Sequence, residues 1–194
     1  GDTRLSSVER YDPAVGAWEA VAPMTEERDG LTVTVLDGKL YAVGGYNNGD
    51  LSSVERYDPA VGAWEEVAPM AEERDGLTVT VLDGKLYAVG GDGGDTRLSS
   101  VERYDPSVGA WEAVAAVGAW EAMAPMAEAR CTHGVAVLDG KLYAAGGEKV
   151  EEDEDGDMPV NTVERFDPVT NGWEAVAPMV TARSLHLADD GDGV

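Results

Sequence analysis

The chain has 194 residues, enough for one sizeable domain, with 43% hydrophobic residues and a formal net charge of −24. This charge disfavours direct binding to nucleic acid or to an anionic membrane surface. No apolar run approaches the length of a membrane span, and no signal-peptide pattern is present. The single cysteine, Cys131, excludes an intramolecular disulfide and fits a reducing compartment, so we expect an intracellular, cytoplasmic chain.

The acidity of the chain has two interpretations. The first is solubility or adaptation to high salt, because an acidic surface alone says little about fold or partner. The second is attraction for a cationic partner.

Long segments of the sequence recur. Residues 51–91 repeat residues 5–45 with 39 of 41 positions identical. Residues 94–106 repeat residues 1–13 without a change, so the spacing is 46 residues and then 47. A period of this size indicates stacked supersecondary units, each too small to bury a core by itself.

The unit at residues 28–73 is predicted to contain four short strands and no helix. Alternation of apolar and hydroxyl side chains indicates the first strand, and Asp37-Gly38 predicts a type I′ hairpin turn after it. The second strand ends at Gly44-Gly45, where the chain needs positive φ or has no room for a Cβ. Prolines end the third and fourth strands. The expected strands are 31–36, 39–44, 53–57 and 63–67.

The motifs keep one order in every unit: an Asp-Gly turn, two glycines, a Val-Glu-Arg-aromatic-Asp-Pro strand, a tryptophan, and Ala-Pro-Met before an arginine. This order resembles the Kelch repeat over nearly the whole chain. The resemblance implies an all-β fold, a Kelch-type β-propeller of four-stranded antiparallel blades. The repeated arginines are expected to tie the connections between blades by hydrogen bonds to backbone carbonyls. They are Arg28, Arg74, Arg130 and Arg183.

The units do not add up to a whole number of blades, so we expect one domain forming a partial or small ring of about three and a half to four blades. Three alternatives remain in order of preference: a fragment of a longer propeller, a four-bladed ring completed by the N-terminal strand pair, and several chains that share one ring. The predicted parts are a half blade at 1–27, blades at 28–73, 74–129 and 130–182, and a truncated blade at 183–194.

A duplication interrupts the second full blade. Residues 108–115 are echoed at 117–124, which inserts nine residues and a spare tryptophan. Only Trp111 or Trp120 can occupy the fourth-strand position, so the other copy must bulge out or add a strand. A neutral duplication is the first interpretation, and an extra contact surface is the second.

An acidic insertion at residues 148–160 lengthens the loop after the third double glycine. Its charge density predicts a solvated, mobile loop. Because it lacks the glycine at position six and the glutamate at position twelve of a calcium loop, no metal site is expected.

Residues typical of catalysis are scarce. Cys131 lies two positions from His133, but no third group is evident to orient the imidazole. We expect both to be fillers on the innermost strand of their blade. The chain is therefore predicted not to be an enzyme, with no catalytic residue and no cofactor.

Function is expected where the repeats differ, in loops on one face of the ring. In the Kelch family, partner peptides contact the loops after the double glycine and the connections between blades. Few arginines line these positions here, which favours a basic or neutral peptide over an acidic one. After the double glycines the carried-over positions are Tyr46, Asn47, Asn48, Asp92, Glu148 and Lys149, and between blades they are Asp29, Asp75, Cys131 and Ser184.

The resemblance thus implies a protein–protein interaction module whose partner is a protein carrying a basic segment, with no nucleic acid and no membrane insertion. One alternative is a Kelch-fold enzyme acting on a sugar or small metabolite in the central channel. A channel lined by threonines favours interaction over catalysis. Another alternative is a structural subunit of a larger assembly. The expected channel residues are Thr32, Thr34, Thr78 and Thr80.

Overall fold

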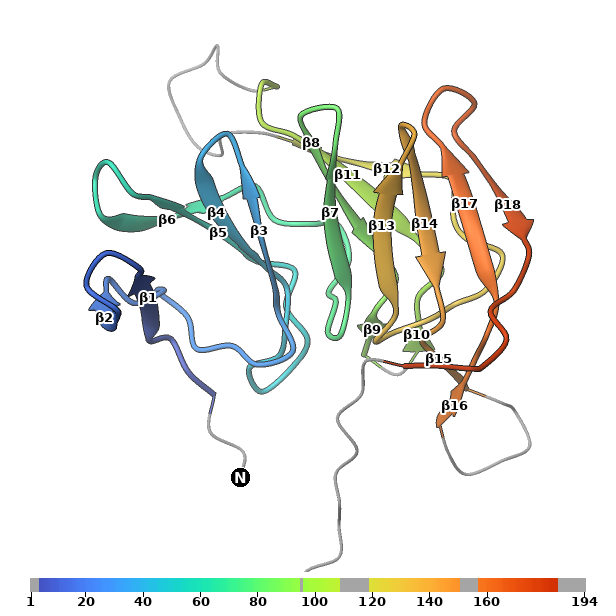
Figure 1. The fold of residues 1–194 in the computed structure, drawn as a ribbon, viewed down its shortest axis with the longest axis horizontal. Helices are drawn as coiled ribbons and strands as arrows, with labels where there is room; N and C mark the ends of the chain where they lie inside the picture. The colour runs from blue at the N-terminus through green and yellow to red at the C-terminus, as the bar shows by residue number, and fades with distance from the viewer. Residues whose placement is uncertain (1–3, 95, 109–118, 151–156, 185–194) are drawn as a thin grey trace, which may run out of the picture.

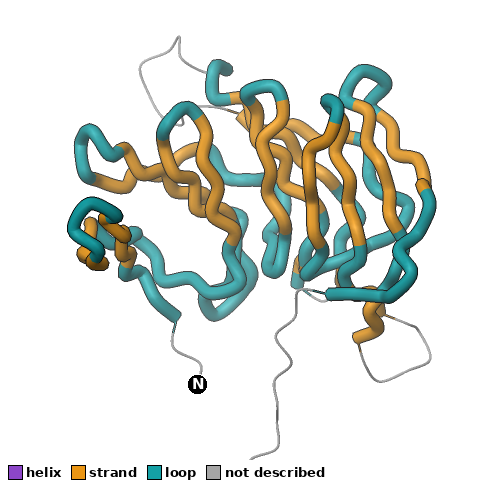
Figure 2. The backbone as a smooth tube through the Cα atoms, viewed as in Figure 1, coloured by secondary structure: helices purple, strands orange, loops and turns teal. Residues whose placement is uncertain are grey.

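The structure is a computed structural model that describes residues 4–94, 96–108, 119–150 and 157–184. Its regular elements are all β-strands, as the sequence predicts, and Figure 2 shows strands and loops without a helix in these ranges. Among these residues, therefore, no helix is long and apolar enough to span a bilayer.

Twelve of the strands form three four-stranded antiparallel sheets, each joined in simple sequence order from one edge to the other. The first sheet contains β3 (Thr32–Leu36), β4 (Lys39–Val43), β5 (Val54–Asp58) and β6 (Ala63–Val67). The second contains β7 (Thr78–Leu82), β8 (Lys85–Val89), β11 (Val101–Asp105) and β12 (Ala119–Met123). The third contains β13 (Gly134–Leu138), β14 (Lys141–Ala145), β17 (Val163–Asp167) and β18 (Gly172–Val176).

Three smaller strand pairs complete the described elements. The N-terminal pair, β1 (Val8–Asp12) with β2 (Ala17–Val21), has the sequence of the third and fourth strands of a blade and forms the half blade. The other two pairs lie in loops: β9 (Asp92–Gly93) with β10 (Thr96–Arg97), and β15 (Glu148–Val150) with β16 (Asp157–Pro159). The ends of the acidic insertion are thus paired strands rather than the solvated loop expected; residues 151–156 lie outside the described ranges.

The first strands of the three sheets, β3, β7 and β13, lie side by side, and the sheets fan out from them (Figure 1). Two threonines expected to line the channel join these strands. The Thr32 hydroxyl donates to the Leu77 carbonyl at 2.7 Å, and the Thr78 hydroxyl donates to the His133 carbonyl at 2.6 Å. The arrangement is an arc of a Kelch-type propeller with three four-stranded blades and the half blade.

The Asp-Gly turns have the predicted type I′ geometry. Asp37 has φ 51° and Gly38 has φ 74°, so both central residues adopt the left-handed conformation that this turn needs. The turns at 83–84 and 139–140 repeat these values within a few degrees.

Each double glycine meets both conditions that the sequence offered as alternatives. Gly44 has φ +61°, and a Cβ there would lie 2.5 Å from the Arg74 carbonyl oxygen. Gly45 has φ +95°, and its Cβ would lie 2.4 Å from the Asp29 carbonyl oxygen. A side chain at either position would therefore push neighbouring backbones apart.

The apolar core lies between the sheets and is the same at both junctions. Leu36 and Tyr41 of the first sheet pack with Leu86 and Tyr104 of the second. At the next junction, the equivalent positions of the second and third sheets form a second cluster. Its members include Leu82, Tyr87, Leu142 and Phe166.

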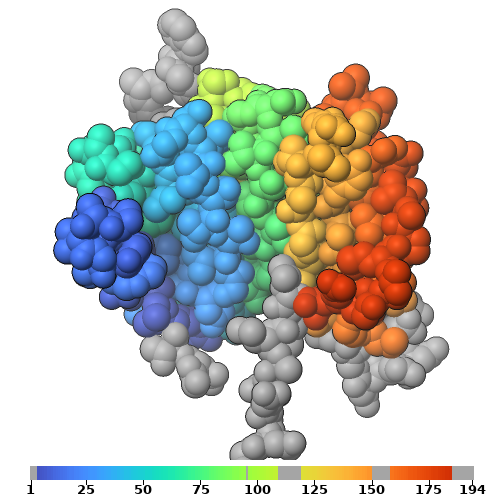
Figure 3. Space-filling model, viewed as in Figure 1, coloured from blue at the N-terminus to red at the C-terminus, as the bar shows by residue number. Residues whose placement is uncertain are grey.

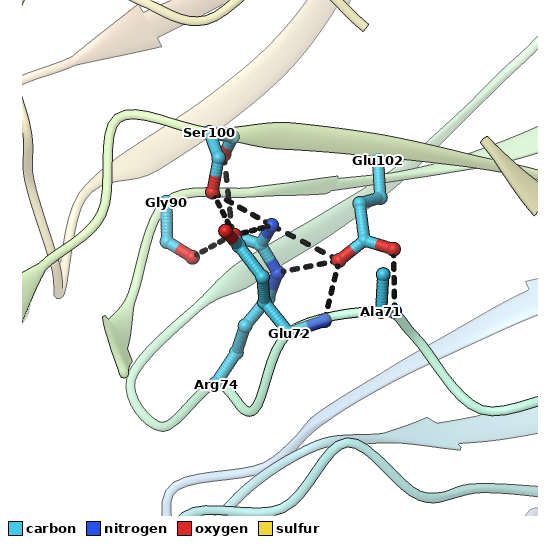
Figure 4. A network of polar contacts seen from close by, with 6 residues as sticks. All are labelled: Ala71, Glu72, Arg74, Gly90, Ser100 and Glu102. Atoms are coloured by element: carbon cyan, nitrogen blue, oxygen red, sulfur yellow. Dashed lines mark hydrogen bonds and ion pairs between the residues drawn. The ribbon is translucent and has the colours of Figure 1, made fainter. Parts of the chain in front are cut away.

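A buried arginine holds each sheet to the segment that precedes it. Arg74 is fully buried, donates to the Gly90 carbonyl at 2.8 Å and the Ser100 carbonyl at 3.1 Å, and forms an ion pair with Glu102 at 3.1 Å (Figure 4). Glu102 also accepts the backbone N–H of Ala71 at 2.7 Å. We call this arrangement the arginine clasp.

The clasp recurs in the other two sheets. Arg28 pairs with Glu55 at 3.1 Å, and Arg130 pairs with Glu164 at 3.0 Å. Each of these arginines also donates to the carbonyl of the first glycine of its unit, which confirms the predicted bonds to backbone carbonyls for Arg28, Arg74 and Arg130. The Arg183 side chain makes no such bond to a described residue.

The second copy of the duplicated segment occupies the fourth-strand position of its blade. Trp120 on β12 lies opposite Tyr104, and its indole N–H donates to the Ala68 carbonyl at 2.9 Å. Trp64 of the first sheet and Trp173 of the third also donate to an alanine carbonyl at 2.9 Å. Trp111, in the first copy, lies outside the described residues.

We expect Trp120→Ala to lower the free energy of unfolding by about 3 kcal/mol, because the ring packs on Tyr104 and fills the junction with the first sheet. Trp111→Ala is expected to cost much less, since only one tryptophan can occupy this position. Urea denaturation of both variants measures the difference, and equal large losses would contradict the assignment.

Candidate functional site

The predicted loop positions come together as pairs. In each unit, the residue after the clasp arginine forms an isolated β-bridge with the residue after the double glycine. In the second unit, the N–H of Asp75 and the N–H of Asp92 each donate to the other's carbonyl at 2.8 Å. The three pairs are Asp29 with Tyr46, Asp75 with Asp92, and Cys131 with Glu148.

The pairs of adjacent units are joined in one row. The Gly76 N–H donates to the Gly30 carbonyl at 3.2 Å, and the Thr132 N–H donates to the Gly76 carbonyl at 3.0 Å. These residues directly follow Asp29, Asp75 and Cys131. We call the three bridged pairs, with the loops at 47–50 and 149, the bridge row.

Negative charge is concentrated along this row. The pKa of Asp75 is raised above its ordinary value, first by burial and then by repulsion from Asp50, Asp29 and Asp92. Asp29 is exposed, whereas Asp75 and Asp92 are half-buried. Three carboxylates therefore lie close enough to Asp75 to influence it.

Two arginines that the sequence analysis did not assign to the site partly offset this charge. Arg97 on β10 lies 3.3 Å from a carboxylate oxygen of Asp92 and 3.9 Å from one of Glu148. Arg4 lies over the Tyr46 ring, 4.8 Å from its centre, and donates to Asn48. Their signal in the sequence was the Thr-Arg dipeptide, which precedes the third strand in two copies of the repeat and is missing from the other two.

The other predicted positions differ in accessibility. Asn48 is exposed and Asn47 is half-buried in a tight loop, where the Asn47 N–H donates to the Gly49 carbonyl at 2.9 Å. Glu148 and Cys131 are buried, so they support the row instead of forming its surface. Lys149 lies on β15 and is half-buried; Ser184 is half-buried and lines a pocket of ≈ 220 Å³ with Thr132.

The third unit carries Cys131-Thr132-His133 where the other two carry Asp-Gly-Leu. Both the cysteine and the histidine precede β13, so they are not on the innermost strand as expected. Burial raises the pKa of the Cys131 thiol to about 12, so the thiol stays protonated at neutral pH and is a poor nucleophile. Thr132 has φ +48°, where the other units have glycine.

His133 is fully buried, and neither ring nitrogen has a hydrogen-bond partner among the described residues. Burial, with a smaller contribution from Arg130, lowers its pKa to about 3. It occupies the position of Leu77, which packs in the core of the preceding junction. The described ranges hold no group of three or more His, Cys, Asp or Glu side chains suited to a metal ion.

Comparison with known proteins agrees with the propeller fold. A family model for the KLHDC2/KLHL20/DRC7 Kelch-repeats domain matches residues 1–188, so the chain belongs to the Kelch-repeat family. Among solved structures, that of YjhT aligns with 87% of this chain and 57% of its own at a TM-score of 0.69, with 19% identity. This likeness concerns the fold.

Curated relatives match over short stretches. Human Kelch-like protein 5 is 56% identical over 46 residues, which are 23% of this chain and 6% of that protein. The mouse influenza virus NS1A-binding protein homolog is 45% identical over 62 residues, which are 32% of this chain and 9% of that protein. The matched stretches thus span less than a tenth of these two relatives.

Acidification should destabilise the fold through His133. Its pKa is lower in the folded protein than in the unfolded chain, so below about pH 6.5 the unfolded chain binds a proton that the folded protein does not. The contribution of His133 to unfolding free energy should fall by about 2 kcal/mol between pH 7 and pH 5.

His133→Leu restores the residue of the other repeats and removes this contribution. Thermal or urea unfolding at pH 7 and pH 5 should show a smaller pH dependence and a higher stability in the variant. An unchanged pH dependence would mean that the imidazole is solvated or hydrogen-bonded in the folded protein.

Proposed function

We propose that this chain is a protein-interaction module and that the bridge row is its docking surface. The supporting observation is that the backbone arrangement recurs in each unit, whereas the residues that it pairs differ from unit to unit. The glycines and the clasp arginines recur in each unit, whereas the bridged pairs differ: Asp-Tyr, Asp-Asp and Cys-Glu. Residues that differ between units of one frame are free to serve recognition.

Membership of the Kelch-repeat family supports an interaction role. The name of one matched relative, the mouse influenza virus NS1A-binding protein homolog, records binding of a viral protein. For this chain the proposed partner is a protein with an extended segment rich in Lys or Arg. Carboxylates gathered along the bridge row attract such a segment and speed its association.

Besides its acidic charge, the bridge row has side chains that are held in fixed positions. Arg97 and Arg4 hold Asp92 and the Tyr46–Asn48 loop in place. Asp29 is exposed and carries no ion pair to any described residue, so it is the carboxylate open to a cationic side chain. Asp50 also carries no ion pair to a described residue, but its carboxylate accepts the backbone N–H of Gly94.

Substituting the carboxylates of the row should weaken binding of a labelled Arg/Lys-rich peptide. We expect Asp29→Asn/Asp75→Asn/Asp92→Asn to lose about tenfold in affinity at low salt, because it removes three of the negative charges that attract the peptide to the row. The difference from wild type should shrink as salt rises. Fluorescence anisotropy measures both effects.

The matched control changes three other aspartates to asparagine. Asp37, Asp83 and Asp139 occupy the type I′ turns at the opposite ends of the inner hairpins, and asparagine suits their positive φ. This variant has the same net charge as the first. Equal loss in the two triple variants would show that the peptide responds only to overall charge and would move the site away from the bridge row.

A further inference from the structure

Amide side chains are rare in this chain, which has four asparagines and no glutamine. Two of the asparagines precede a glycine: Asn48-Gly49 lies in the loop after the first double glycine, and Asn171-Gly172 lies in the turn between β17 and β18. An asparagine followed by glycine is prone to modify itself. The next backbone nitrogen can reach the side-chain carbonyl carbon and close a five-membered ring, and glycine places no Cβ in the way.

The Asn48-Gly49 pair forms the tip of an open loop. Tyr46 and Asp50 pair across the base of this loop, and the Asn47 N–H donates to the Gly49 carbonyl at 2.9 Å. Asn48 and Gly49 are both exposed. A Cβ built on Gly49 would meet no atom within 4 Å, and no described residue accepts the Gly49 N–H. The backbone nitrogen that would attack is therefore unhindered and open to solvent.

Arg4 is held over this tip by the segment that precedes the half blade. The backbone of its neighbour Leu5 forms a β-bridge with Arg28, and Figure 3 shows the N-terminal residues, in darker blue, beside the lighter blue of the first sheet. The Arg4 guanidinium lies 4.8 Å from the centre of the Tyr46 ring and donates to Oδ1 of Asn48 at 3.1 Å. A cationic donor on this oxygen stabilises the negative charge that develops there when the carbonyl carbon is attacked.

The second Asn-Gly pair has different surroundings. Oδ1 of Asn171 accepts the backbone N–H of Ala124 at 3.0 Å, so its donor is neutral. Gly172 is the first residue of β18 and lies opposite Asp167 of β17, so its backbone is held in the sheet. The same dipeptide therefore occurs once with a guanidinium and an open backbone, and once without them.

We propose that Asn48 is a site of spontaneous modification, at which the side-chain amide becomes a carboxylate with Arg4 as the assisting group. The Gly49 nitrogen forms a bond to Cγ of Asn48 and gives its proton to solvent. The bond between Cγ and Nδ2 breaks, and Nδ2 takes up a proton and leaves as ammonia. The succinimide ring that remains is opened by water at either carbonyl, so that residue 48 becomes aspartate or isoaspartate.

The product resembles an arrangement that the next unit already has. Arg97, the equivalent of Arg4 in the repeat, lies 3.3 Å from a carboxylate oxygen of Asp92 and 3.9 Å from one of Glu148. A carboxylate at position 48 gives Arg4 a partner of the same kind, and isoaspartate also lengthens the loop backbone by a methylene group. The effect on docking at the bridge row rests on the proposed function, whereas the modification itself does not.

Ageing of the purified full chain tests the proposal. Mass spectrometry of tryptic peptides, sampled over time at neutral and mildly alkaline pH, detects the mass gain from amide to acid at each asparagine. In the folded protein we expect Asn48 to convert about tenfold faster than Asn171. The rate at Asn48 should rise with pH, because the attacking nitrogen must lose its proton. In urea the two asparagines should convert at similar rates, since the structure no longer distinguishes them.

Variants of Arg4 separate the role of the guanidinium from that of the dipeptide. Arg4→Gln should slow conversion of Asn48 about tenfold, less than the loss of an oxyanion donor costs in a buried site, because the loop tip is open to solvent. It should leave Asn171 unchanged. Arg4→Lys keeps a cationic donor and should retain most of the rate. The matched control, Arg10→Gln, makes the same charge change on β1 and should age like wild type.

Equal rates at Asn48 and Asn171 in the folded protein would overturn the proposal, and so would a rate at Asn48 that Arg4→Gln leaves unchanged. Faster conversion of Asn48 in urea than in the folded protein would also overturn it, because the loop would then protect the amide. Circular dichroism confirms that each variant is folded. These measurements need no peptide, so failure of this site and failure of the docking surface are distinguishable.

Discussion

The buried arginine is the interaction on which the rest of the structure depends. Its guanidinium, a planar group with five donors, satisfies two backbone carbonyls and one buried glutamate at once, as Arg74 does with Gly90, Ser100 and Glu102. Its own carbonyl accepts from Gly45 of the preceding unit at 2.8 Å. Each arginine therefore binds one unit through its side chain and the previous unit through its backbone.

The double glycines follow from this arrangement. The Arg74 carbonyl comes so close to Gly44 that no Cβ fits between them. The same close approach brings the next residue of each unit into the bridge row, beside the residue after the arginine. The structural repeat and the candidate recognition surface are thus consequences of one contact.

The sequence predicted the strands and turns well because they depend on the pattern of neighbouring residues. Alternation and turn chemistry placed β3 and β4 within one residue of their observed bounds, and Asp37-Gly38 adopts the predicted turn. The ten loop positions were chosen from a family resemblance, and the pairing of Asp75 with Asp92 could not be seen in them. That pairing depends on the distance between loops of one unit, which only the folded chain sets.

Contacts between units were hardest to foresee. Arg97 and Glu148 are distant in sequence and meet only because β7 and β13 are neighbours. The sequence predicted His133 to be a filler on the innermost strand, whereas the imidazole precedes β13 and replaces a core leucine. Repetition in the sequence identified the strands and turns of each unit. The surroundings of residues that differ between units could be seen only in the structure.

A double-mutant cycle on Arg74 and Glu102 tests the central claim most directly. Arg74→Met and Glu102→Gln each leave a buried partner uncompensated, so each should lower the free energy of unfolding by about 3–5 kcal/mol. The double variant should lose little more than either single variant, because the two groups act as one unit. Losses that add within about 0.5 kcal/mol would contradict the account, since they would show that the arginine and the glutamate stabilise the fold independently.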